Sequence, residues 1–311
     1  MVEIFKPNKN IEKLILILII SMSLWFIYTY FVIIPNREWI NNFFIDYKKN
    51  LIESPIKYRV FITDLIIQIS KVLKINNYLL VYTTVMLVVF NFSIYQLFLF
   101  LEKAVNSIEL LSYSILISYV FIVLSYTYHF YQPWSYLDIG LYSFSYRALF
   151  FNKKYNYNFF IIFSIALLNR ETGIFIALLY LIHSLDSIVK IKSILNALLL
   201  FLYAIGVLFI LRYFKGYEPS HDYIKLGHIF EENTQPGNLI IYFLILLCSG
   251  ILYLAFNTNY DKRFRSGYLT MLFFMPLYLV YGIWIEIRML LPFLPLLVLP
   301  LSKKMNEIIN P

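Results

Sequence analysis

The sequence is poor in cysteine and in the short motifs of soluble enzymes. Its single cysteine, Cys248, lies within an apolar run, which excludes a disulfide framework, a CxxC pair and a thiolate metal site. GxSxG, GxGxxG, a Walker loop and the HExxH spacing of a helical zinc site are all absent. Soluble-type hydrolases and nucleotide-binding enzymes therefore have no support. No metal-ligating residues are predicted, and the sequence does not decide whether a divalent cation takes part.

Charged residues are also scarce. They form 14% of the 311 residues, against roughly 25% in a typical soluble domain, whereas 60% are hydrophobic and 20% are aromatic. The net charge is +8, but the Lys and Arg residues lie in short loops between apolar segments and form no groove interleaved with aromatic residues. We therefore expect no nucleic-acid partner. The composition predicts an integral membrane protein whose cationic loops meet membrane lipids and anionic lipid-linked substrates.

Long apolar runs follow one another along the chain, several of them about 20 residues long and able to cross ~30 Å of hydrocarbon. They predict an all-α fold, a polytopic transmembrane helical bundle of about ten spans that forms a single domain over residues 1–311. The expected spans are 14–34, 78–101, 109–127, 137–151, 158–168, 172–185, 194–212, 239–256, 268–284 and 289–301. Residues 158–185 could instead form one tilted helix. Because Arg170 at its middle would cost about 2.5–3.5 kcal/mol to insert, we favour two short helices that meet at a polar turn.

The distribution of Lys and Arg predicts the orientation. The short loops that are cytoplasmic when the N-terminus is inside are rich in them, whereas the outer turn 128–136 has none. We therefore expect both termini in the cytoplasm and two longer outer loops, 35–77 and 213–238. Within the first loop, residues 61–73 place Ile62 and Leu65 on one face and Asp64 and Gln68 on the other. This pattern is typical of an interfacial helix that lies flat on the outer leaflet.

Ionisable residues near the spans gather on the predicted outer side. They are Glu38, Asp46, Glu53, Arg59, Asp138, Arg170, Glu171, Glu286 and Arg288. Such groups are expensive at membrane depth and are functional candidates, although each alone could be a headgroup anchor or a structural ion pair. Arg288 could bind phosphate with its planar fork, or could pair with Glu286 to cap the last helix. Because the residues come from five separate segments, we expect one outward-facing active site.

The order of these features resembles the GT-C superfamily of membrane glycosyltransferases, which use polyprenyl-phosphate-linked sugars. In that family a long outer loop with a catalytic acid and a flat helix follows the first span. The matching features here are Asp46, Tyr47 and helix 61–73, residues 54–60, Asp138 with the Lys153, Lys154 turn, residues 169–172, and residues 286–288. Two departures stand out. The loop offers both Glu38 and Asp46 as the acid, and the C-terminal periplasmic domain of several members has no counterpart.

The resemblance implies a site and a reaction. Asp46, or alternatively Glu38, would act as the general base on the acceptor hydroxyl, and arginines would stabilise the departing lipid phosphate. The implied substrate-binding residues are Tyr58, Arg59, Asp138, Asn169, Arg170, Glu171, Glu286 and Arg288. The donor would be a lipid-linked sugar, and the acceptor a glycan, a lipid or a protein. We expect the protein in a bacterial cytoplasmic membrane, with its site on the non-cytoplasmic face.

Two other interpretations stay open. A membrane transporter or lipid-carrier flippase would show paired broken helices and a site near the bilayer midplane. A glycan polymerase, ligase or acyltransferase of the outer leaflet would rely on a His or Arg pair in the larger outer loop, where His221 and His228 lie.

Overall fold

The computed structural model describes residues 9–52, 59–127, 133–151, 157–186, 191–216, 249–250, 253, 256, 262–281 and 287–310. Within them the chain is helical and contains no strand, which confirms the all-α expectation. The elements of the first half are α1 (Lys9–Tyr28), η1 (Thr29–Ile33), α2 (Arg37–Lys48), α3 (Val60–Val72), α4 (Tyr78–Ala104), α5 (Ile108–Leu124) and η3 (Ser125–Thr127). Those of the second half are α6 (Pro133–Phe151), α7 (Tyr157–Asn169), η4 (Glu171–Gly173), α8 (Ile174–Asp186), α9 (Ile191–Lys215), η5 (Lys262–Phe264), α12 (Arg265–Tyr281), η6 (Ile287–Phe293) and α13 (Leu294–Ile309).

All expected spans except 239–256 coincide with helices, and 239–256 lies almost wholly outside the described residues. Three helical segments are long and apolar enough to cross a membrane, namely Asn10–Ile33, Tyr78–Ala104 and Ser193–Lys215. Among the shorter helices, α5, α7 and α8 are also apolar. The length and composition of these segments are those of a membrane protein.

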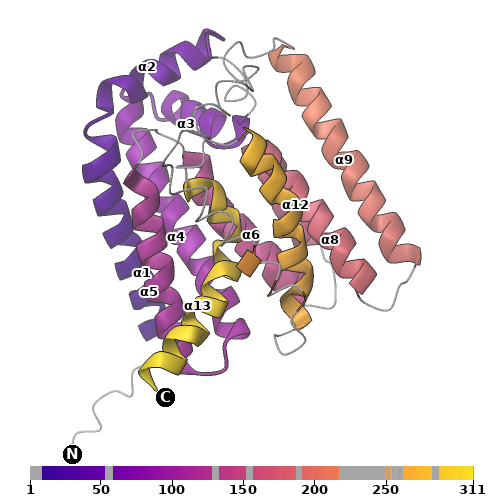
Figure 1. The fold of residues 1–311 in the computed structure, drawn as a ribbon. Helices are drawn as coiled ribbons and strands as arrows, with labels where there is room; N and C mark the ends of the chain where they lie inside the picture. Colours follow the sequence, from indigo (N-terminus) through magenta and orange to yellow (C-terminus); the bar gives the residue numbers. More distant parts are fainter. Residues whose placement is uncertain are drawn as a thin grey trace, which may run out of the picture.

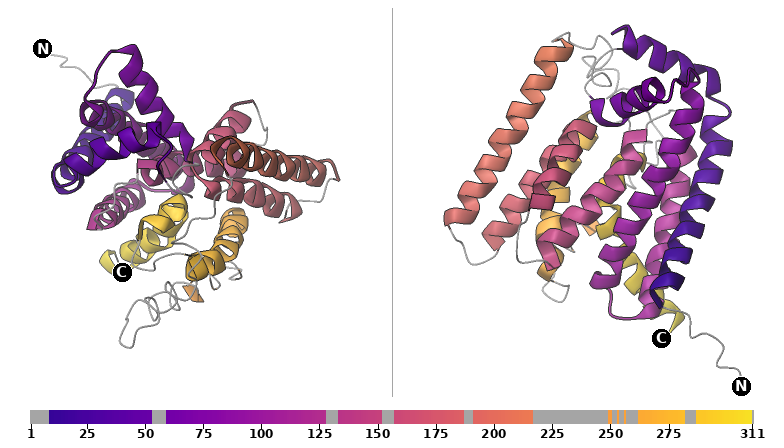
Figure 2. Two further views of the ribbon diagram at one scale, coloured as in Figure 1. Left: turned by 90° about the horizontal axis from the view of Figure 1, so that it is seen from above. Right: turned by 180° about the vertical axis from the view of Figure 1, so that it is seen from behind.

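The two ends of the helical bundle are formed by different elements. α1 begins and α13 ends at the same end of the bundle (Figure 1). α2 and α3 lie across the opposite end, as Figure 2 shows from behind. The limits of α3 agree within one residue at each end with the amphipathic helix that the sequence predicted over 61–73.

The core is built around α4 and α6, which pack closely along their length. A Cβ on Gly140 would lie 2.6 Å from the Phe92 ring and 3.0 Å from the Cα of Ser93, so only glycine permits this approach. The Ser93 hydroxyl donates to the carbonyl of Tyr136 at 2.8 Å. Small side chains at this contact are typical of helices that pack in lipid, where close approach replaces the hydrophobic effect between helices.

The apolar run 158–185 is broken into two helices, as the sequence analysis favoured. Arg170 is extended (φ −163°, ψ 146°), η4 follows it, and α8 starts at Ile174. A Cβ on Gly173 would lie 2.6 Å from the carbonyl carbon of Ala166, so the chain turns back against the last turn of α7. This hairpin turn positions Asn169, Arg170 and Glu171 together beside α6.

Candidate functional site

Arg170 and Asp138 form a buried ion pair at the hairpin turn. Their side chains are 2% and 1% exposed, and 3.7 Å separates Arg170 Nη1 from Asp138 Oδ2. Asn169 Nδ2 donates to Asp138 Oδ1 at 2.7 Å and to the Trp134 carbonyl at 2.9 Å. Arg170 Nη1 also donates to Ser135 Oγ at 3.4 Å. The first turn of α6 and the turn after α7 are thus joined by charged and polar contacts.

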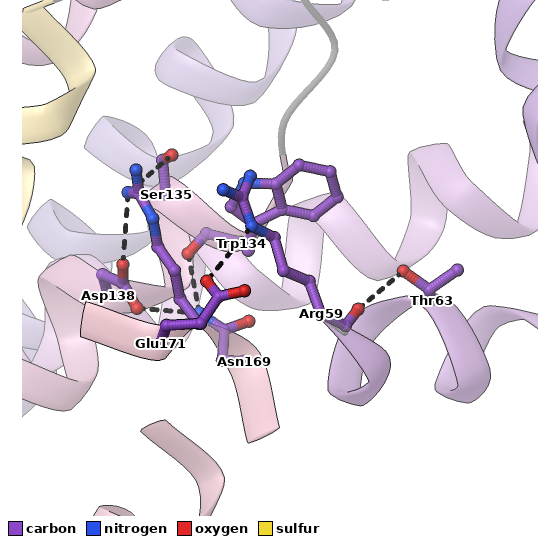
Figure 3. A network of polar contacts seen from close by, with 8 residues as sticks. Arg59, Thr63, Trp134, Ser135, Asp138, Asn169 and Glu171 are labelled. Atoms are coloured by element: carbon purple, nitrogen blue, oxygen red, sulfur yellow. Dashed lines mark hydrogen bonds and ion pairs between the residues drawn. The ribbon is translucent and has the colours of Figure 1, made fainter. Parts of the chain in front are cut away.

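A second ion pair lies beside the first and brings in α3. Arg59 Nε is 3.7 Å from Glu171 Oε2, and the Arg59 guanidinium lies over the Trp134 ring with 4.8 Å from Cζ to the centroid. The Arg59 carbonyl accepts from Thr63 Oγ1 at 3.0 Å, which ties the residue to the start of α3. Figure 3 shows Arg59 beside the Trp134 ring, with Glu171, Asn169 and Asp138 nearby. Planar donors held in this way match the oxygens of a phosphate.

Several buried oxygens of this cluster have no hydrogen-bond partner within the described residues. They are Asp138 Oδ2, Asn169 Oδ1, Glu171 Oε1 and Thr172 Oγ1. Helix α6 holds the turn that carries Thr172 in place. The Tyr142 hydroxyl, one helical turn after Asp138, donates to the Thr172 carbonyl at 2.6 Å. Buried polar atoms in proteins are nearly always satisfied, so a group of unpartnered acceptors in one place needs an explanation.

An apolar cavity of about 560 Å³ is lined by residues that neighbour members of the cluster in the sequence, although no cluster residue lines it. Its walls come from α3, α4, α6 and α7, and among them Phe61 and Ile62 follow Arg59 while Leu137 and Leu141 flank Asp138 in helical spacing. Thr84 is its one hydroxyl-bearing wall residue among those described, and that hydroxyl donates to Leu80 of its own helix at 3.0 Å. The cavity lies in the roughly 300–1,000 Å³ range of small-molecule sites. The described chain thus carries a buried polar cluster and an apolar cavity that have the elements α3, α6 and α7 in common.

A third group of contacts joins α2, α3 and α9 at the same end of the molecule. Lys215 Nζ donates to the Tyr47 hydroxyl at 3.1 Å, lies 4.6 Å from the centroid of its ring and is 4.0 Å from Asp64 Oδ1. Burial raises the pKa of the Tyr47 phenol above its usual range, and the negative charge and hydrogen bond of Asp64 add to this rise. The phenol therefore stays protonated and neutral between the two charged groups.

The residues that the sequence singled out fall into three sets. Arg59, Asp138, Asn169, Arg170 and Glu171 come together in the cluster. Glu38 is exposed and Asp46 is half-buried on α2, and no hydrogen bond or ion pair joins either carboxylate to the cluster within the described residues. The remaining predicted residues, Glu53, Tyr58 and Glu286, lie outside the described residues, and Arg288 is described only in its backbone, within η6.

Sequence reasoning missed four members of the cluster: Trp134, Ser135, Tyr142 and Thr172. Thr172 lay within the predicted turn 169–172, of which only Asn169, Arg170 and Glu171 were expected to bind substrate, and Ser135 lies three residues before Asp138. Trp134 and Tyr142 carried no signal, because aromatic residues form 20% of the chain and any one of them could have been a packing residue. The cavity wall on α3 was implied only by the apolar face of the predicted interfacial helix.

No group of three or more His, Cys, Asp or Glu side chains that could hold a metal ion occurs among the described residues. His183 lies near the end of α8, with Nδ1 3.2 Å from Ser266 Oγ. The other histidines, His129, His221 and His228, lie outside the described residues, as does most of the predicted outer loop 213–238.

Comparison of the chain with models of protein families, with curated proteins and with solved structures gives no match. The function is therefore argued from the residues and geometry described above.

Proposed function

We propose that this chain is a multi-pass membrane glycosyltransferase that moves a sugar from a polyprenyl-phosphate donor to an acceptor on the non-cytoplasmic face. The proposal includes about ten spans, both termini in the cytoplasm of a bacterial cell, and α3 flat on the outer leaflet. The observations that carry it are the buried ion pairs of two arginines and an apolar cavity whose wall residues Phe61 and Leu137 lie within two positions of Arg59 and Asp138 in the sequence. We infer that the cluster and the cavity meet at a junction. An amphiphile with an anionic head and a long apolar tail fits such a junction.

The phosphate of the donor is assigned to Arg59. Its guanidinium is held on two sides, by Glu171 and by the Trp134 ring, and its orientation is therefore restricted before a ligand arrives. Restricting an arginine in advance lowers the entropy lost on binding and favours a fixed, bidentate phosphate geometry. Arg170 is the second cation beside the same turn, and Arg288 from η6 remains part of the proposed set.

The tail of the donor is assigned to the cavity. Each methylene that leaves water for an apolar site contributes about 0.8 kcal/mol, although a tail that leaves lipid for protein gains far less. The cavity therefore selects its ligand mainly by shape and by its distance from Arg59. Its α3 wall contributes Phe61, Ile62, Leu65, Ile69 and Leu73, so the helix that follows Arg59 also covers the tail site.

The proposed chemistry is a single displacement. The acceptor oxygen attacks the anomeric carbon, the bond between that carbon and the phosphate oxygen breaks, and the lipid phosphate leaves with the electron pair. A carboxylate takes the proton from the acceptor hydroxyl, and Asp46 on α2 is our first choice. The neighbouring Tyr47 is linked through Lys215 to Asp64 of α3, so the end of α2 is tied to the helix that begins beside Arg59. Inversion at the anomeric carbon follows from the single step.

The two alternatives receive less support from the geometry. A transporter would need discontinuous spans that continue beyond their break. The described break at Arg170 is a hairpin turn, because Gly173 packs against Ala166. An acyltransferase or polymerase site built on His221 and His228 lies outside the described residues.

The direct test follows the donor lipid. The full chain in nanodiscs would receive a polyprenyl-phosphate-linked hexose with a labelled lipid, and membranes of the source cells would supply the acceptor. We expect release of labelled polyprenyl phosphate and transfer of the hexose. Arg59→Gln should lower the rate about 10- to 150-fold, which corresponds to the loss of a hydrogen bond to a charged group. Arg265→Gln, whose guanidinium lies over Phe256, is the matched control.

A second arm tests the cavity. Leu65→Trp would fill space in the α3 wall and should raise the KM for the lipid donor, whereas Leu116→Trp, on the exposed side of α5, should not. Full donor turnover by Arg59→Gln would remove the proposed phosphate site. Wild-type protein that leaves every donor intact in nanodiscs, and that carries labelled lipid across the bilayer when reconstituted in sealed liposomes, would replace the transferase with a flippase.

A further inference from the structure

The cluster contains more hydrogen-bond acceptors than a phosphate can use. Phosphate oxygens accept hydrogen bonds, and so they pair with Arg59 and Arg170. Asp138 Oδ2, Asn169 Oδ1 and Glu171 Oε1 are acceptors as well, and the Thr172 hydroxyl can accept or donate; none of the four has a hydrogen-bond partner within the described part of the chain. Asp138 and Asn169 are each 1% exposed, so bulk water does not satisfy them. A ligand that occupies this place must bring donors.

The charges of the cluster decide what kind of donor fits. Two guanidiniums face two carboxylates in pairs of 3.7 Å each, so the four ionised side chains sum to zero. A divalent cation bound to Asp138 Oδ2 would lie at most about 6 Å from Arg170 Nη1, given metal–oxygen distances of about 2.0–2.6 Å. Repulsion from that guanidinium opposes such a cation. With the donor phosphate bound beside Arg59, a ligand carboxylate would add a further anion to that phosphate and the two protein carboxylates, and it would bring only more acceptors.

We propose that these four oxygens form a subsite for an uncharged, hydroxyl-rich group, the neutral sugar ring of the donor. Hydroxyl groups donate to the unpartnered oxygens and bring no charge. They also accept hydrogen bonds from the guanidiniums that pair with Asp138 and Glu171. The inference rests on the proposed function and deepens it, because it names the class of sugar: a neutral hexose or pentose is taken and a uronic acid is refused.

Thr172 is the residue best suited to test this subsite by substitution. Its backbone carbonyl accepts from Tyr142, but its hydroxyl oxygen makes no hydrogen bond within the described residues. Thr172→Val keeps the branched shape and the carbonyl, and it removes only the hydroxyl. Thr270→Val is the matched control, because Thr270 is buried on α12 and its hydroxyl donates to Ser266 of its own helix at 2.8 Å.

The experiment measures binding and needs no turnover. Full-length protein in nanodiscs, with EDTA present, would be titrated with farnesyl phosphate, farnesyl phosphoryl glucose and farnesyl phosphoryl glucuronate. We expect the glucose conjugate to bind at least tenfold more tightly than the glucuronate conjugate. Thr172→Val should weaken the glucose conjugate about 2- to 12-fold, the range of one net hydrogen bond. It should leave farnesyl phosphate unchanged, and Thr270→Val should change none of the three.

The outcomes separate the two proposals. Failure of farnesyl phosphate itself to bind would overturn the proposed function, and the sugar subsite with it. Binding of farnesyl phosphate with equal affinity for both conjugates would overturn the sugar subsite alone. Equal weakening of all three ligands by Thr172→Val would also overturn the sugar subsite. A preference for glucose that appears only after Mg²⁺ replaces EDTA would show that a cation, not a hydroxyl group, meets these oxygens.

Discussion

The guanidinium of Arg59 stacks on the indole ring of Trp134, with 4.8 Å between Cζ and the ring centroid, while Nε faces Glu171. The contact joins the start of α3 to the first turn of α6. Cation–π contacts are worth about 0.5–1 kcal/mol when exposed and about 2 kcal/mol or more when desolvated, and Arg59 is 9% exposed. Trp134 therefore orients the arginine to which we assign the donor phosphate.

Loss of the Trp134 ring should weaken phosphate binding without unfolding the protein. We expect Trp134→Leu to raise the dissociation constant for farnesyl phosphate about 2- to 30-fold, since the stacking energy is lost. Trp134→Phe should recover most of the affinity, because a ring face remains under the guanidinium. Titration of both variants in nanodiscs measures this. A purely structural role for the ring would instead lower the melting temperature and leave the ligand affinity of the folded fraction intact.

The Asp138–Arg170 pair should be more sensitive to the loss of one partner than to the loss of both. Arg170→Met leaves a buried carboxylate without its cation, which costs about 3–5 kcal/mol. The double variant Asp138→Leu, Arg170→Met removes both charges, so it should be more stable than the single one. The free energy of unfolding in mixed micelles, measured for the single variants Arg170→Met and Asp138→Leu and for the double variant, tests this order. Additive losses would mean that the two side chains do not act as a pair.

Substitution by alanine should destabilise the protein at Gly173 and stabilise it at Gly206. In Gly173→Ala the new Cβ would lie 2.6–2.7 Å from the backbone of Ala166 and Leu167, which cannot move as a side-chain tip can. We expect a loss of about 1–3 kcal/mol from overpacking and a lower donor affinity, because Arg170 would shift. In Gly206→Ala nothing lies within 4 Å, and the helix gains about 0.5–1 kcal/mol. Thermal unfolding of the two variants provides the comparison, and equal melting temperatures would argue against the tight hairpin.

Asp46→Asn tests the proposed base. General-base catalysis contributes typically 10²–10⁴-fold, so the variant should lose at least about 100-fold in kcat and keep its affinity for farnesyl phosphate. Glu38→Gln and Glu53→Gln are measured alongside it, since Glu38 and Glu53 are the other candidate acids of the first loop. If one of these two is the inactive variant instead, the base is the acid that it replaces. If all three variants transfer sugar at the wild-type rate, none of these acids is the base. Glu307→Gln on α13, at the other end of the bundle, is the control.

Much of the fold could be predicted because apolar runs dominate the chain. The helix limits of α4 and α9 follow directly from where hydrophobic residues give way to polar ones, such as Asn77, which caps α4 by accepting from the Leu80 amide. The break at Arg170 was predictable from the cost of placing its charge in lipid. These are local properties of the sequence, and no tertiary contact is needed to see them.

The details of the site were less predictable. That Asp138 pairs with Arg170 and Arg59 with Glu171, rather than with other ionisable residues of the outer side, depends on how α3 and the hairpin pack against α6. The apolar cavity is likewise a property of four helices together. The orientation of Glu38 and Asp46 was not predictable either, because the sequence of an outer loop does not show which way a carboxylate faces.

The partners of each ion pair are far apart in the sequence, and this has a consequence for how the protein is made. Arg59 leaves the ribosome well before Glu171, and Asp138 before Arg170. During synthesis Arg59 and then Asp138 therefore reach the membrane before their partners have been made, and each charge is not neutralised until then. The hairpin α7–η4–α8 brings both missing charges within two consecutive residues. Its arrival therefore neutralises the whole cluster at one moment of biogenesis, and chains that stop before it would be expected to be targets of membrane quality control.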